Sequence, residues 1–181
     1  MTAVPVHAVE LYFDDAAEAR VRALWEALER DAIPTTSSFA NPYYRPHVSL
    51  AVFETADVEP RLPSLRAAVA GAVGIDLRLT NLGMFVEGER LIAFLGVAAS
   101  GPLLAAHQAV AATLDGAVAV RGFYRPGAWT PHCSLPVCPS TAAEVAATVA
   151  VARAARLPVR ARVAGAHLVE LATGAPVAGL G

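Results

Sequence analysis

Residues 45–52 read RPHVSLAV, which places His47 and Ser49 two residues apart inside an apolar run that is typical of a strand. Residues 130–137, TPHCSLPV, repeat the pattern with His132 and Ser134. From the proline onward, five of the seven positions are identical, and equivalent positions lie 85 residues apart in a chain of 181. A repeat at nearly half the chain length predicts two structurally related lobes.

The two copies also share their surroundings. A loop with aromatic, arginine and proline residues precedes each, at residues 33–46 and 120–131, and a helical pattern follows each. We expect strands at residues 8–14, 47–53, 75–86, 90–98 and 132–138, a hairpin turn at 87–89, and a last pair of strands within 157–174. We expect helices at residues 15–32, 58–74, 101–116 and 140–155, the first capped by Asp15. The chain therefore passes through the same cycle of strands and helices twice.

Length and composition favour one folded unit. The chain is 55% hydrophobic and 17% charged, so we expect a single domain over residues 1–181 rather than a disordered chain. No apolar run approaches the roughly 18 residues that span a bilayer. The N-terminus lacks the basic start and apolar segment of a secretory signal. We therefore expect a cytoplasmic protein with no membrane partner, and a monomer.

Charge limits the ligands that the chain is suited to bind. The formal net charge of −2 argues against a long duplex nucleic acid as partner, because duplex binding usually requires a basic face. All 14 basic residues are arginine, so Schiff-base chemistry on lysine is excluded and any cationic phosphate contact comes from arginine. Cys133 and Cys138, the only cysteines, form neither a CxxC pair nor a disulfide framework. A small phosphate ester remains compatible with these limits.

The repeated motif suits acid and base chemistry at phosphorus. Residues two apart on a strand face the same side, roughly 6.6 Å apart, so each motif presents one imidazole and one hydroxyl together. Two such strands side by side would offer two imidazoles to one concave surface. Near neutral pH one histidine acts as a base while another acts as an acid. The hydroxyls of Ser49 and Ser134 are then placed to donate to phosphate oxygens, with no need for a metal or other cofactor.

The segments PHVSL and PHCSL, one in each half of the chain, resemble the two-histidine (2H) phosphoesterases, which include the LigT-like 2′-5′ RNA ligases and the cyclic nucleotide phosphodiesterases. The stretch YRPGAWTPHCSL is especially similar to the second-motif region of bacterial members. This resemblance implies an α+β fold in which two antiparallel-sheet lobes, with outer helices, are related by a pseudo-twofold around a central cleft. It further implies metal-free hydrolysis or ligation at 2′,3′-cyclic or 2′-5′ phosphodiesters of a nucleotide or short RNA, with His47 and His132 as acid and base and Ser49 and Ser134 on the phosphate.

The loops before the motifs carry candidate substrate-binding residues. Tyr124 and Trp129 are candidates for stacking on a nucleobase, and Arg45 and Arg125 for pairing with phosphate oxygens. The alternatives are that the two aromatic rings pack the loop against the sheet and that the two arginines are solvated. The other loop aromatics, Tyr43, Tyr44 and Phe123, favour the packing interpretation.

Other interpretations of the motif residues remain open. A non-catalytic module that binds nucleotides or RNA ends would keep the same cleft. A serine hydrolase using Ser49 or Ser134 ranks lower because no GxSxG elbow is present. A zinc site built on His47, His132 and Cys133 is weakly supported, since Cys133 should point away from His132 and no further ligand stands at a convincing spacing.

Overall fold

The computed structural model describes residues 4–116 and 118–181 and is built round one antiparallel sheet. Its strands are β1 (Val6–Phe13), β2 (His47–Glu54), β3 (Asp76–Glu87), β4 (Arg90–Val97), β5 (Ala119–Val120), β6 (His132–Ser134), β7 (Val159–Glu170) and β8 (Pro176–Gly179). Its helices are α1 (Asp15–Arg30), α2 (Leu62–Val69), α3 (Gly101–Leu114) and α4 (Ala142–Ala154), with 3₁₀ turns at Ser37–Ala40, Glu59–Arg61 and Gly122–Tyr124. The α+β class expected from the sequence is confirmed.

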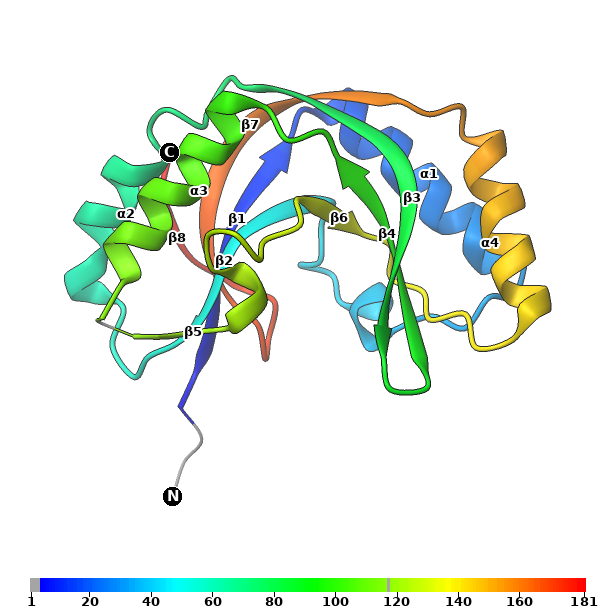
Figure 1. The fold of residues 1–181 in the computed structure, drawn as a ribbon, viewed down its shortest axis with the longest axis horizontal. Helices are drawn as coiled ribbons and strands as arrows, with labels where there is room; N and C mark the ends of the chain where they lie inside the picture. Colours follow the sequence, from blue (N-terminus) through cyan, green and yellow to red (C-terminus); the bar gives the residue numbers. More distant parts are fainter. Residues whose placement is uncertain (1–3, 117) are drawn as a thin grey trace.

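The strand β7 joins two halves of the sheet. The strand order is β5-β2-β1-β7-β3-β4-β6, and β8 also pairs with β7. The first residues of β7 pair with β3, and its later residues pair with β1. The helices α2 and α3 pack together at one end of the molecule, and α1 and α4 at the other (Figure 1). The two expected lobes therefore share one continuous sheet.

The sheet arches so that the two motif strands meet. Although β2 and β6 are far apart in the strand order, they contact one another beneath the arch formed by β7 (Figure 1). The backbone of His47 lies close enough to the Cys133 sulfur to lower the pKa of that thiol, although burial raises it by more. The repeated stretches of the sequence thus come together in space.

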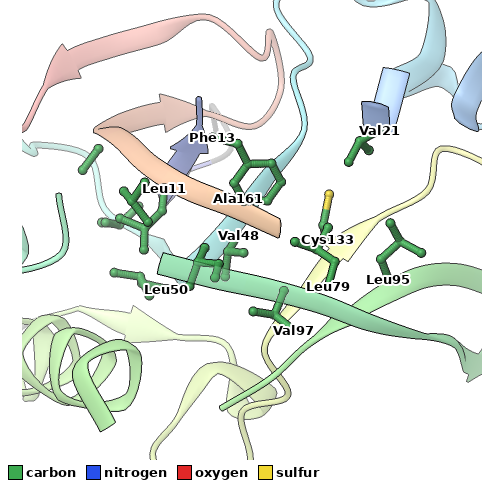
Figure 2. Packing of buried hydrophobic residues seen from close by; sticks show 14 of the residues in the cluster. Leu11, Phe13, Val21, Val48, Leu50, Leu79, Leu95, Val97, Cys133 and Ala161 are labelled. Carbon is green, nitrogen blue, oxygen red and sulfur yellow. The ribbon is translucent and has the colours of Figure 1, made fainter. Parts of the chain in front are cut away.

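A shared hydrophobic core holds the two motif strands in place. Val48 and Leu50 of β2, Cys133 of β6 and Leu79 of β3 are fully buried in one cluster. Figure 2 shows these side chains together with Leu11 of β1, which belongs to the same cluster. Burying side chains of this size stabilises the fold by roughly 1.5–3 kcal/mol each. Because alternate residues of each strand point inward, the remaining ones point to the opposite side.

The strand β6 is shorter than the strand expected at residues 132–138. It ends at Ser134 because Pro136 has no N–H to donate to a sheet ladder. The carbonyl of Pro136 instead accepts a hydrogen bond from the N–H of Thr36, at 2.8 Å. The chain after the second motif is therefore held by the loop that precedes the first motif.

The last pair of strands expected within residues 157–174 is wrong in its bounds. The strand β7 runs without a break from Val159 to Glu170, and its partner β8 begins only at Pro176. The turn between them includes Gly174 at φ 68°, a backbone conformation that glycine adopts at little cost. The last residues of the span in which the sequence predicts two strands therefore lie in the turn that connects β7 to β8. The short strand β5 was not expected from the sequence.

The first helix is capped by Asp14 rather than by Asp15. The Asp14 carboxylate accepts a hydrogen bond from the backbone N–H of Ala17 at 3.1 Å and another from the N–H of Arg162 in β7 at 2.5 Å. One side chain therefore caps α1 and anchors it to the sheet.

The second helix begins later and ends earlier than the span expected at residues 58–74. It consists of a 3₁₀ turn at Glu59–Arg61 followed by α2, with Pro63 at its start. Proline lacks the backbone N–H that a continuous helix needs, so the first part remains a separate turn. Within the described residues, no helix is both long and apolar enough to cross a bilayer.

Candidate active site

One cavity of about 590 Å³ has walls from both motif strands. His47 and Ser49 of β2 and His132 and Ser134 of β6 all line it. The alternating pattern of each strand explains this, because the intervening residues face the core while the polar pair faces the cavity. The volume lies within the roughly 300–1,000 Å³ that is usual for small-molecule sites. The four polar side chains of the repeat are thus brought to one place.

The two imidazoles are held in the same way. Nδ1 of His47 lies 2.6 Å from the carbonyl oxygen of Arg45, and Nδ1 of His132 lies 2.7 Å from that of Thr130. A carbonyl oxygen only accepts, so each Nδ1 carries a proton and donates it to the residue two positions earlier. Each Nε2 is left to exchange protons with a group in the cavity. Both histidines therefore have the tautomer that acid and base catalysis requires.

The surroundings of the two histidines differ. The rings of Phe85 and Phe94 make T-shaped contacts with His132, with ring centroids 4.9 and 5.4 Å away. Burial lowers the pKa of His132; the hydrogen bond to Thr130 opposes this effect and the nearby His47 adds to it. His47 instead has Nε2 at 3.4 Å from Oε1 of Glu10. One imidazole lies among aromatic rings and the other beside a carboxylate.

The serines are paired across the two halves of the molecule. The Tyr44 hydroxyl, from the loop before β2, shares a hydrogen bond with Ser134 of β6. The Tyr124 hydroxyl, from the loop before β6, shares one with Ser49 of β2. Burial raises the pKa of both tyrosines, so both hydroxyls stay protonated near neutral pH. Each motif serine therefore lies beside a tyrosine from the loop of the opposite motif.

Of the four substrate-binding residues expected from the sequence, only one lines the cavity. Tyr124 lines the cavity. Arg45 does not, and its guanidinium binds the Glu18 carboxylate at 2.6 Å. Arg125 lines a separate depression beside α3. Trp129 stacks on His107 with the ring centroids 4.0 Å apart and donates from Nε1 to the carbonyl of Ser49 at 3.1 Å, so its role here is to pack the loop on β2.

Three further cavity residues were not selected from the sequence. Tyr43 and Phe123 are 54% and 58% exposed, and both line the cavity, one from each motif loop. Glu10, only 5% exposed, lines it from β1. A signal for Glu10 was present, since it is the one carboxylate within the apolar run at residues 7–13. Its proximity to His47 depends on strand register, because Glu10 is the partner of Ser49 in the β1–β2 ladder.

A model of the 2′-5′ RNA ligase superfamily matches residues 13–175, a range that contains both motifs and the loops before them. The chain belongs to this superfamily. The two-histidine resemblance found in the sequence is thereby confirmed, and membership supports a phosphodiesterase-like function. A separate search of curated proteins found no match.

Among solved structures, this chain is similar to the crystal structure of the MHV ns2 PDE domain. The two chains are 15% identical, the match covers 75% of this chain and 84% of that one, and the TM-score is 0.48.

The structure does not bring Cys133 together with His47 and His132 as a zinc site would require. The Cys133 side chain is fully buried in the core, away from the cavity, and burial raises the pKa of its thiol to about 12. Within residues 4–116 and 118–181, no group of three or more histidine, cysteine, aspartate and glutamate side chains is arranged to hold a metal ion.

Gly83 makes room for the aromatic wall beside His132. A Cβ added at this position would overlap the ring of Phe94, which stacks on Phe85 with centroids 4.2 Å apart. We expect Gly83→Ala to displace the Phe94 ring, to lower the free energy of unfolding by about 1–3 kcal/mol, and to shift the NMR resonances of the His132 ring. Urea unfolding and histidine-selective spectra measure the two effects.

The matched control is Gly101→Ala, at a position where an added Cβ meets no heavy atom within 4 Å. It should leave both the unfolding free energy and the His132 resonances close to those of the wild type. An unchanged His132 spectrum in Gly83→Ala would show that Phe94 does not position this imidazole.

Proposed function

We propose that the protein acts on a 2′,3′-cyclic phosphate or a 2′-5′ phosphodiester of a nucleotide or short RNA, without a metal ion, by paired-histidine catalysis. The observation that carries the proposal is the equivalent placement of the two imidazoles. Each donates from Nδ1 to the carbonyl two residues earlier, and both line the same cavity. Two such groups suit a reaction that needs a base and an acid at once.

In the hydrolytic direction, the proposed reaction is one in-line displacement. The neutral Nε2 of one histidine takes a proton from water as the water oxygen bonds to phosphorus. The bond from phosphorus to the ribose 2′ or 3′ oxygen breaks, and the protonated Nε2 of the other histidine gives its proton to that oxygen. Ligation to a 2′,3′-cyclic phosphate follows the same course with a ribose hydroxyl in place of water: its oxygen bonds to phosphorus, its proton passes to the basic histidine, and a ribose oxygen of the cyclic ester leaves with the proton of the other histidine. The hydroxyls of Ser49 and Ser134 donate to the non-bridging oxygens, where charge accumulates.

The lining of the cavity supports a substrate of nucleotide size. The exposed rings of Tyr43 and Phe123 offer flat apolar faces on which a nucleobase can stack. Arg121, also in the lining, supplies a cation for a phosphate or a base edge. The net charge of −2 favours a nucleotide or short oligonucleotide over a long duplex. We propose these three residues as substrate contacts, in place of Arg45, Arg125 and Trp129.

The test is hydrolysis of 2′,3′-cyclic nucleotides in the presence of excess EDTA, with chromatography of the products. We expect turnover at an unchanged rate under chelation, and a single product, either the 2′- or the 3′-monophosphate, which identifies the bond that breaks. A 2′-5′ linked dinucleotide is assayed in parallel. Turnover abolished by EDTA and restored by added divalent metal contradicts metal independence. Tight binding of both substrates without any turnover instead supports a non-catalytic binding module.

A further inference from the structure

The outer face of the sheet carries a cluster of arginines that the proposed reaction does not use. Arg78 of β3 is the partner of Arg160 in the β3–β7 ladder, and Arg162 lies two residues further along β7. All three residues are exposed. Together with Asp14 and Asp76 they line a depression of about 590 Å³. Arg78, Arg160 and Arg162 are called the outer arginine cluster below.

The outer arginine cluster and the candidate active site lie on opposite sides of the hydrophobic core. Ala161, between Arg160 and Arg162 on β7, points into this core, as does Val48, the neighbour of His47 on β2 (Figure 2). Because alternate residues of a strand point to opposite faces, the arginines face solvent outside the arch of β7, while His47 faces the cavity beneath it (Figure 1). A ligand of the cluster is therefore not the group that reacts between the two histidines.

The positive charge of the cluster is only partly neutralised. Arg162 has Nη1 at 3.5 Å from Oδ1 of Asp76, in an ion pair whose side chains are 64% and 83% exposed. The Asp14 carboxylate instead accepts hydrogen bonds from backbone N–H groups, including that of Arg162. Within the described residues, neither Arg78 nor Arg160 has a carboxylate at ion-pair distance. Two guanidinium groups are thus left to bind an external anion.

Folding alone does not favour this arrangement. Like charges directly opposite one another in an antiparallel ladder destabilise a sheet, and Arg78 and Arg160 form such a pair. The neighbouring sequence adds to the charge, because residues 153–162 contain four arginines and no acidic residue in a chain of net charge −2. Arg20 of α1 joins them, since its guanidinium donates to the carbonyl of Arg156 at 3.3 Å. A bound anion would relieve the repulsion within this group.

The chemistry of the depression favours a phosphate chain over a protein or a membrane. Protein interfaces are anchored by aromatic and other large apolar side chains, and proteins that lie on a membrane insert such side chains. None of the exposed large apolar side chains among the described residues lines this depression. Guanidinium groups bind phosphate oxygens in paired hydrogen bonds. Spacings of about 4.8 Å between strands and about 6.6 Å along one strand allow the cluster to contact neighbouring phosphates.

We propose that the outer arginine cluster binds the phosphate backbone of single-stranded RNA at a site separate from the cavity. The choice of RNA rests on the proposed function, whereas the phosphate contact does not. Phosphate contacts carry no sequence information, and of the described residues that line the depression none is aromatic, so binding has no base preference. A cluster of this size spans two or three phosphates of one strand, whereas a duplex requires a broad basic face.

The test is fluorescence anisotropy of a labelled oligouridylate of about 12 nucleotides, titrated in EDTA at several salt concentrations. Each phosphate contact on a single strand contributes about 0.7 to the slope of log affinity against log salt. The double variant Arg78→Gln with Arg160→Gln should therefore reduce the slope by about 1.4 and weaken binding about 25-fold near 0.1 M salt. An oligoadenylate of equal length should show the same two changes.

Two matched variants separate charge from general damage. Asp76→Asn releases Arg162 from its ion pair, so the affinity for the oligouridylate should rise about fivefold, which is the value of one added contact. Arg30→Gln, at the far end of the 16-residue helix α1 and about 24 Å from its start, should leave affinity and slope unchanged. Urea unfolding of the double variant should show no loss of stability, because a repulsive pair has been removed.

Specific results overturn the proposal. Equal affinity of the wild type and the double variant would remove the role of the cluster. Tighter binding of an oligoglutamate of matched charge would make the partner an acidic protein, and tighter binding of vesicles made of equal parts phosphatidylserine and phosphatidylcholine would make it a membrane.

Turnover of a 2′,3′-cyclic mononucleotide distinguishes the outer arginine cluster from the cavity. It should be the same in the double variant and the wild type, because the hydrophobic core separates the two sites. Loss of turnover in the double variant alone would show that its effect on RNA binding arises at the cavity, against the proposal. Absence of turnover in both proteins is a failure of the proposed function, and the anisotropy measurement still decides whether the cluster binds RNA.

Discussion

His47→Ala and His132→Ala are each expected to lower kcat/KM for a 2′,3′-cyclic nucleotide by about 10²–10⁴-fold, the usual contribution of a positioned acid or base. Each imidazole is fixed by its hydrogen bond to a backbone carbonyl, so its Nε2 is pre-oriented and water is a poor replacement. Steady-state kinetics in EDTA measure the loss. The affinity for the product monophosphate should change much less, because the serines and the loop residues still bind it.

A histidine outside the cavity provides the control for this prediction. His7 of β1 is buried beside Phe53 and is absent from the cavity lining. Changing it to alanine should alter the unfolding temperature but leave kcat/KM within a few-fold of the wild type. If either motif variant keeps activity near the wild-type level while His7→Ala does too, paired-histidine catalysis is wrong.

Ser49→Ala and Ser134→Ala are expected to lower kcat by about 10²–10³-fold each, in the range found when one preorganised donor to a developing oxyanion is removed. Both serines line the cavity next to their histidines, and each interacts with a tyrosine hydroxyl from the loop of the opposite motif. The effect should fall on kcat more than on KM, since charge on the phosphate oxygens grows in the transition state.

The tyrosines give this prediction a specific control. Tyr44→Phe should produce a smaller loss than Ser134→Ala, and combining the two changes should cost little more than Ser134→Ala alone, because the tyrosine acts through the serine. The same comparison applies to Tyr124→Phe with Ser49→Ala. Losses that multiply in both pairs would show that the tyrosines act independently of the serines.

The repeated motif predicts that two strands bring their histidines and serines to one cavity, because each motif has a local alternation and the two motifs recur in both halves of the chain. The alternation of His47 and Ser49 with apolar neighbours correctly assigns one face of β2 to the core and the other to a polar site. The repeat at His132 predicts that a second strand meets the first. The contact between β2 and β6 confirms this expectation.

Other parts of the site depend on tertiary structure that no local pattern reveals. Glu10 reaches His47 only because the register of β1 against β2, which shifts after Val9, places Glu10 opposite Ser49. Arg45 resembles a phosphate ligand in the sequence, but α1 brings Glu18 within 2.6 Å of it. Trp129 resembles a stacking platform, but His107 on α3 covers its face. In each case a residue distant in the sequence determines what the side chain does.

The most direct test of the central claim is a kinetic cycle on the two histidines in EDTA, comparing the wild type, His47→Ala, His132→Ala and the double variant. If the two imidazoles act together on one phosphorus atom, the double variant should be no more than about tenfold slower than the slower single variant, as is found for catalytic groups that act as a unit. A double loss equal to the product of the two single losses, or a single variant with near wild-type turnover, would contradict the claim.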